Sequence, residues 1–101
     1  MNFNRVILYY NFVPIADPEA VKLWQKTLCK SLNIKGRILI SSQGINGTLG
    51  GHMDDVKKYI KNTREYPGFK KIDFKWSQGT GNDFPKLKIQ VKDELVAFGY
   101  Q

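Results

Sequence analysis

The chain has 101 residues, of which 42% are hydrophobic, 13% aromatic and 25% charged. These proportions indicate one globular domain and exclude a disordered, collagen-like or coiled-coil chain. No apolar run approaches the ~20 residues that span a bilayer, so no membrane contact is expected. Sixteen basic and nine acidic residues give a net charge of +7, which favours a polyanionic partner such as RNA. One cysteine cannot form an intrachain disulfide, which fits a reducing, cytoplasmic compartment.

The first 33 residues predict a strand followed by a helix. Residues 5–12 are rich in β-branched and aromatic side chains and predict a strand that is largely buried. Asp17 can cap free N–H groups and Pro18 suits the first helical position, so a helix should begin there and end near residues 32–33. Its inward face is expected to carry four large apolar residues: Val21, Trp24, Leu28 and Leu32.

A hairpin and a second helix are predicted next. Residues 37–42 favour a strand, residues 43–47 a turn, and residues 48–50 a short return strand. The turn is placed there because Asn46 and Gly47 both tolerate positive φ, and this pair is a strong hairpin signal. Apolar spacing predicts a helix from Met53 to about Arg64, which the sequence at residues 66–68 should stop.

Two alternating segments complete the pattern. Residues 71–77 place Ile72, Phe74 and Trp76 on one side, and residues 86–92 alternate lysines with apolar residues. Residues 95–98 could extend the last strand beyond a kink. The predicted order is therefore β-α-β-β-α-β-β. The simplest packing is an α+β, ferredoxin-like or acylphosphatase-like sandwich, with two helices on one face of a mainly antiparallel sheet.

Catalytic and metal chemistry finds little support. Cys29 lies near the inward face of the first helix without a neighbouring histidine, which predicts a packing role. His52, the single histidine, is expected to be a partly exposed residue at a helix start, so no Cys/His zinc site can form. We therefore expect no catalytic residue, no metal and no cofactor. The loop at residues 11–17 lacks the Gly and Arg of an acylphosphatase phosphate loop, so that activity would rest on fold analogy alone.

Two groups of residues could contact an anion. Gly44, Asn46, Gly47 and Thr48 are expected in or beside a turn whose exposed amides could hold an anion, although a purely structural turn is the stronger alternative. The second group is basic. Period-2 spacing should put Lys86, Lys88 and Lys92 on one sheet face, with Arg37 as a further candidate for nucleic-acid contact. Tyr9 and Ile7 could share that face, where an aromatic beside cations could stack a base.

Three stretches of the chain resemble a known bacterial family. Residues 9–12, residues 36–51 (GRILISSQGINGTLGG) and residues 84–96 (FPKLKIQVKDELV) are similar to the rhodanese-related tRNA uridine hydroxylases, which act at the wobble position. In that family this region is an N-terminal acylphosphatase-like domain. A rhodanese domain with the active-site cysteine in a Cys-x5-Arg-type loop follows it, and we expect that domain to be absent from these 101 residues. Cys29 does not replace that cysteine, because no arginine follows at the required spacing.

The resemblance leaves three functions to compare. In the first, residues 1–101 form a single accessory domain that helps to hold tRNA while the missing domain performs the chemistry. In the second, the open sheet face docks on the rhodanese domain and has no RNA affinity of its own. The third is a small acylphosphatase-like hydrolase. Salt-dependent tRNA binding, association with the rhodanese domain, or turnover of an acyl phosphate would distinguish them.

Overall fold

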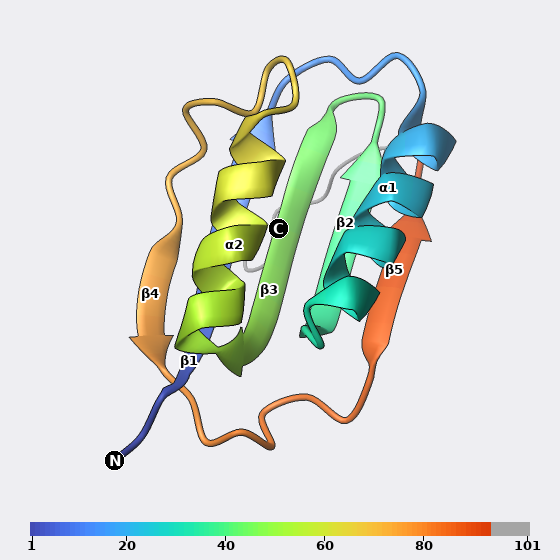
Figure 1. The fold of residues 1–101 in the computed structure, drawn as a ribbon. Coiled ribbons are helices and arrows are strands. Elements are labelled where there is room, and N and C mark those ends of the chain that lie inside the picture. The colour runs from blue at the N-terminus through green and yellow to red at the C-terminus, as the bar shows by residue number, and fades with distance from the viewer. Residues whose placement is uncertain (94–101) are drawn as a thin grey trace, which may run out of the picture.

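The structure, a computed structural model, describes residues 1–93 and contains the seven predicted elements in the predicted order (Figure 1). The predicted extension at residues 95–98 lies outside the described residues. The elements and their bounds are β1 (Asn4–Phe12), α1 (Pro18–Ser31), β2 (Lys35–Ser41), β3 (Gly44–His52), α2 (Met53–Arg64), β4 (Lys75–Gln78) and β5 (Leu87–Val91).

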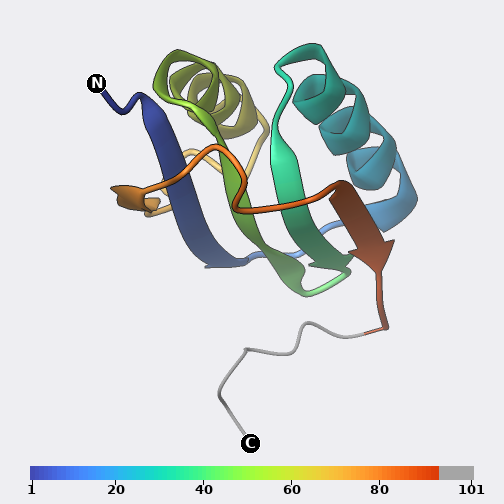
Figure 2. The ribbon, with the colours of Figure 1, turned by 90° about the horizontal axis from the view of Figure 1, so that it is seen from below.

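The five strands form one sheet in the order β4-β1-β3-β2-β5. Every neighbouring pair is antiparallel except β2 and β5, which run parallel. Both helices lie on the same face of this sheet, and within residues 1–93 no helix covers the opposite face (Figure 2). The α+β ferredoxin-like prediction is therefore confirmed, and β5 is the strand added at the edge beside β2. No helix within residues 1–93 is long and apolar enough to cross a membrane.

The helices begin where local capping chemistry places them. Asp17 accepts a hydrogen bond from the backbone N–H of Ala20 at 3.1 Å, which satisfies one free donor of α1. At the start of α2, His52 Nδ1 accepts from the N–H of Asp54 at 3.1 Å. His52 is therefore an exposed helix cap, as its predicted position indicated.

The core between helices and sheet contains a closed polar network. The hydroxyls of Tyr9 and Tyr59 lie 2.6 Å apart, and Tyr59 donates to Gln25 Oε1 at 2.7 Å. Because that bond uses the only proton of Tyr59, Tyr9 must donate to Tyr59. Gln25 Nε2 in turn donates to Thr63 Oγ1 at 3.3 Å, so each of the four side chains of this network has a hydrogen-bond partner. The centre of the buried face of α1 thus includes Gln25, while three of the predicted apolar residues pack around it half-buried: Trp24, Leu28 and Leu32.

The predicted hairpin turn was wrong by several residues. The chain turns at residues 42–43, and Asn46 and Gly47 lie within β3 opposite Leu39 and Ile38. Local preference of Asn-Gly for turns is outweighed here because β3 pairs along its whole length with β1 as well as with β2. The glycine that the backbone requires is Gly44, with φ 153° and with Asn11 O only 2.2 Å from the position a Cβ would occupy.

The segment at residues 71–77 was predicted as one strand, but only its end pairs. β4 begins at Lys75 and pairs with β1 only from Arg5 to Leu8. Ile72 and Phe74 lie in the loop before β4 and are nevertheless buried in the core. The alternation of apolar residues therefore predicted correctly that these two side chains are buried. It predicted wrongly that they lie in a strand.

Candidate nucleic-acid interface

The open face of the sheet is organised in rows of side chains that cross several strands. Residues that pair in the ladders point to the same face, so the register identifies neighbours directly. One row consists of Leu8, Thr48, Arg37 and Lys88. The next row consists of Tyr10, Asn46, Leu39 and Gln90. Apolar and aromatic side chains thus gather on β1, while cations gather on β2 and β5.

The four basic residues predicted for nucleic-acid contact are all exposed. Arg37 and Lys88 are direct neighbours across the parallel pair, and the backbone ties both ends of β5 to β2. Gly36 N–H donates to Lys86 O at 3.1 Å, and Lys92 N–H donates to Ile40 O at 2.8 Å. Between the lysines, the side chains that pack on the core are Leu87, Ile89 and Val91.

Lys35 was not predicted, although it belongs to the same surface. It lies two residues before Arg37 on β2 and is exposed. We call the set Lys35, Arg37, Lys86, Lys88 and Lys92 the cationic half of the open face. Within residues 1–93 none of these five forms an ion pair, whereas Lys75 at the other edge is compensated by Asp73 at 2.6 Å. Because the described part of the chain offers these five cations no ion-pair partner, they favour a positive potential along β2 and β5.

The predicted aromatic neighbours were assigned to the wrong side of β1. Tyr9 and Ile7 face the helices and are almost fully buried, at 1% and 0% exposure. The aromatic side chains that β1 presents on the open face are Tyr10 and Phe12, whose rings stack with centroids 6.1 Å apart. Phe12 is 63% exposed and Leu8 43%. We call Leu8, Tyr10 and Phe12 the apolar half of the open face.

The segment from Gly44 to Thr48 does not present the turn amides that were expected to hold an anion. Its residues pair with β1 on one side and β2 on the other, so their backbone groups are engaged in the sheet. Gly44, Asn46 and Gly47 are buried and Thr48 is half-buried. Within this segment the Asn46 side chain is 2% exposed, and its Nδ2 has no hydrogen-bond partner within residues 1–93.

Neither Cys29 nor the loop after β1 has the geometry of a catalytic site. Cys29 is completely buried on α1, and burial raises the pKa of its thiol to about 12, which makes it a poor nucleophile. The loop after β1 uses its amides structurally: Val13 N–H donates to Gln43 O and Ile15 N–H to Ser42 O, each at 3.0 Å. Those amides are not free to cradle a phosphate. Residues 1–93 also bring no three His, Cys, Asp or Glu side chains together as metal ligands.

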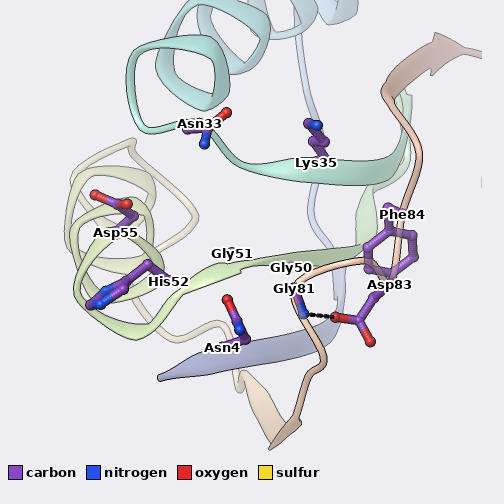
Figure 3. A pocket seen from close by; sticks show the side chains of 10 residues that line it. All are labelled: Asn4, Asn33, Lys35, Gly50, Gly51, His52, Asp55, Gly81, Asp83 and Phe84. Atoms are coloured by element: carbon purple, nitrogen blue, oxygen red, sulfur yellow. Dashed lines mark hydrogen bonds between the residues drawn. The ribbon is translucent and has the colours of Figure 1, made fainter. Parts of the chain in front are cut away.

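Sequence reasoning missed a small pocket at the end of the sheet (Figure 3). It has a volume of about 170 Å³ and lies where β1 and β2 begin and β3 ends, beneath the connection between β4 and β5. Phe84 from that connection and the side-chain amides of Asn4 and Asn33 face it from different sides. Because the three residues are far apart in the chain, no local motif could have indicated the pocket.

The architecture defines the class of the protein, an acylphosphatase-like α+β domain. Two solved structures share this fold at low sequence identity, so they support the fold and nothing about function. An acylphosphatase from Coxiella burnetii aligns with a TM-score of 0.59 at 10% identity, over 86% of this chain and 94% of that chain. The BLUF protein BlrB in its dark state aligns with a TM-score of 0.72 at 19% identity, over 90% of this chain and 74% of that chain.

Sequence comparison identifies the particular family. Residues 4–95 match the family model described as the UPF0176 acylphosphatase like domain, and the chain belongs to this family. It is 62% identical over 99 residues to a tRNA uridine(34) hydroxylase of Corynebacterium glutamicum strain R, covering 98% of this chain and 32% of that protein. A tRNA uridine(34) hydroxylase of Arthrobacter sp. strain FB24 is 57% identical over 99 residues, or 33% of its length. The chain thus spans about a third of these relatives, and the predicted family resemblance is confirmed.

Proposed function

We propose that the chain is the N-terminal accessory domain of an enzyme that hydroxylates uridine at the tRNA wobble position, and that it holds tRNA through the cationic half of its open face. The observation that carries this proposal is the gathering of five cations on and beside β2 and β5, none of which forms an ion pair within the described residues. The names of the relatives support tRNA as the polyanion. The chemistry itself is assigned to the remaining part of the enzyme, because Cys29, the chain's only thiol, is buried and protonated.

The binding would be electrostatic and would carry little sequence preference. A lysine or arginine that neutralises a phosphate releases about one condensed counterion, so affinity falls as salt rises. Arg37 can in addition form two parallel hydrogen bonds with one phosphate, which a lysine cannot. The cationic half would therefore position the tRNA, while base-specific contacts would arise elsewhere.

The test replaces Lys86, Lys88 and Lys92 with Gln and measures tRNA affinity at several salt concentrations. We expect the slope of log K against log salt to fall by roughly 2–3 units. A matched control replaces three exposed helix lysines, Lys26, Lys57 and Lys58, so that both variants lower the net charge from +7 to +4. The control should leave the slope near that of the parent. Equal slopes for the parent and the strand variant would reject phosphate contact by this surface.

A second function is favoured by the apolar half of the same face. We infer that Leu8, Tyr10 and Phe12 pack against the rhodanese domain of the same protein. Large exposed apolar side chains are typical of surfaces that dock on another domain.

This second function has its own measurement. Replacing Leu8 and Phe12 with Ser should weaken association with the remaining two thirds of the Corynebacterium glutamicum relative, measured by titration calorimetry. The same variant should keep the parental salt slope for tRNA, because no cation is removed. Unchanged association would reject docking through β1. The strand-lysine variant provides the complementary control, since it should lose tRNA affinity and keep the association.

A further inference from the structure

The pocket at the end of the sheet is small and has a preformed shape. Its floor is the end of β3 at Gly50 and Gly51, where no side chain intrudes (Figure 3). The Phe84 ring rests against this bare backbone, because a Cβ at Gly50 would lie 3.2 Å from its Cδ2 and Cε2 atoms. Gly81 allows an equally close approach: a Cβ there would lie 3.0 Å from Asn4 Nδ2.

The loop that covers the pocket is fixed by its own hydrogen bonds. Asp83 Oδ2 accepts from the N–H of Thr80 at 2.9 Å. It also accepts from the N–H of Gly81 at 3.3 Å (Figure 3). Gly81 has φ +91°, a conformation that suits glycine. The connection that presents Phe84 is therefore organised before any ligand arrives, which lowers the conformational cost of binding.

The polar groups around the pocket are available for a ligand. The side-chain amides of Asn4 and Asn33, the ammonium of Lys35 and the carboxylate of Asp55 have no hydrogen-bond or ion-pair partner within residues 1–93. Together they offer both donors and acceptors. With Lys35 against Asp55 and Asp83, the lining carries one negative charge more than positive. That balance disfavours a phosphate and suits a neutral ligand with polar edges.

Size and shape restrict the ligand further. The pocket's volume of about 170 Å³ lies below the range of about 300–1,000 Å³ that is typical of pockets for drug-sized ligands. One flat ring system fits this space, and a whole nucleotide does not. An aromatic wall with free amide groups is the usual environment for an unstacked nucleobase, which stacks on the ring and forms hydrogen bonds along its edge.

We propose that this pocket receives one unstacked nucleobase of the RNA whose phosphates lie along the cationic half, an inference that rests on the proposed tRNA contact. The two sites are continuous. Lys35 belongs to both, and Lys86 follows Phe84 by two residues, with its carbonyl bound to Gly36 N–H at 3.1 Å. An RNA strand that follows β2 and β5 is thus led to the pocket, and the base enters it while the phosphates stay outside on the lysines.

Two substitutions test the pocket without disturbing the fold. Phe84→Leu keeps an apolar side chain over Gly50 and removes the aromatic face. Asn33→Gly removes the amide and suits the positive φ of 54° that Asn33 adopts. The matched control is Phe12→Leu, which removes an exposed ring from the apolar half. Each variant is titrated with a single-stranded RNA hexamer, with a hexamer of the same backbone lacking every base, and with tRNA.

For the intact hexamer and for tRNA, Phe84→Leu should weaken binding by about five- to hundredfold, the range that loss of one stacked base gives. Asn33→Gly should weaken it less, and Phe12→Leu should bind like the parent. Every slope against salt should equal the parental slope, because no phosphate contact is lost. With the hexamer that lacks bases, Phe84→Leu and the parent should bind equally.

The outcomes separate the pocket from the proposed function. Salt-dependent binding by the parent together with unchanged affinity of Phe84→Leu and Asn33→Gly overturns the pocket and leaves the tRNA contact standing. An equal loss by Phe84→Leu toward both hexamers also overturns it, because the effect would then not involve a base. Failure of the parent to bind tRNA at low salt overturns the proposed function itself.

Discussion

Gly47 provides the sharpest test of the packing between β3 and the core. A Cβ at this position would lie 2.8 Å from Cε1 of Tyr9 and 3.0 Å from its Cζ and hydroxyl oxygen. The Tyr9 ring cannot move aside easily, because it is 1% exposed and its hydroxyl bonds to Tyr59 at 2.6 Å. Glycine is therefore required at residue 47 by the neighbouring ring. Its backbone is not in the left-handed region that the predicted turn would have needed.

Gly47→Ala should lower the free energy of unfolding by about 1–3 kcal/mol, the usual cost of overpacking a filled core. For a domain of this size the melting temperature falls by roughly 4–8 °C for each kcal/mol. Gly51→Ala serves as the control on the same strand, because its nearest contact would be Ile34 Cγ1 at 3.3 Å, a side-chain atom that can adjust. Thermal melts followed by circular dichroism measure both variants, and Gly51→Ala should change little.

Gly47→Asn distinguishes the steric explanation from the conformational one. If residue 47 occupied a left-handed turn, Asn would be tolerated better than Ala. If the Tyr9 ring is the obstacle, the larger Asn side chain must destabilise the fold more than Ala does. A Gly47→Asn variant more stable than Gly47→Ala would refute the reasoning from the register.

Three further predictions concern the buried core. Cys29 should react with a thiol reagent at pH 8 only as fast as the domain unfolds, because its pKa is raised to about 12; faster labelling of the native chain would contradict its burial. Stability should fall as the pH rises above about 9, since burial raises the pKa of Cys29 from 9.0 and the pKa values of Tyr9 and Tyr59 from 10.0. Each group binds its proton more tightly in the folded state, so its contribution is complete below the unfolded pKa and is lost at higher pH; equal urea midpoints at pH 7 and 10.5 would exclude this. Gln25→Leu should cost about 1–3 kcal/mol in urea denaturation, because it removes the acceptor of the Tyr59 proton and the donor to Thr63 Oγ1; an unchanged midpoint would mean that these two bonds contribute nothing.

The sequence predicted those features that local chemistry determines. α2 spans Met53–Arg64 as its apolar period indicated, and α1 begins at the predicted cap and proline. In both cases the position of the helix is determined by side chains and backbone groups that lie within one turn of each other. The alternation in β5 also placed its lysines outside correctly, because apolar residues lie on one side of that strand only.

Features that depend on distant pairing could not be predicted in the same way. β1 carries large side chains on both faces, so its pattern did not reveal that Tyr9 faces the helices and Tyr10 the open side. The position of the hairpin turn depended on the pairing of β3 with β1, which the Asn-Gly signal does not report. Lys35 was overlooked because it begins a strand whose first residue was predicted to be Arg37.

The cationic half and the pocket have a common structural origin. β4 and β5 lie at opposite edges of the sheet, so the connection between them, residues 79–86, must pass the ends of β1, β3 and β2 (Figure 2). This path places Phe84 on Gly50 and then delivers β5 beside β2, where Lys88 meets Arg37. A four-stranded sheet without β5 and its preceding connection would lose three of the five cations and the aromatic wall together, along with the core packing of Leu87, Ile89 and Val91. The added strand, with the lysines on and beside it, therefore supplies most of the cationic half, on which the proposed tRNA contact depends.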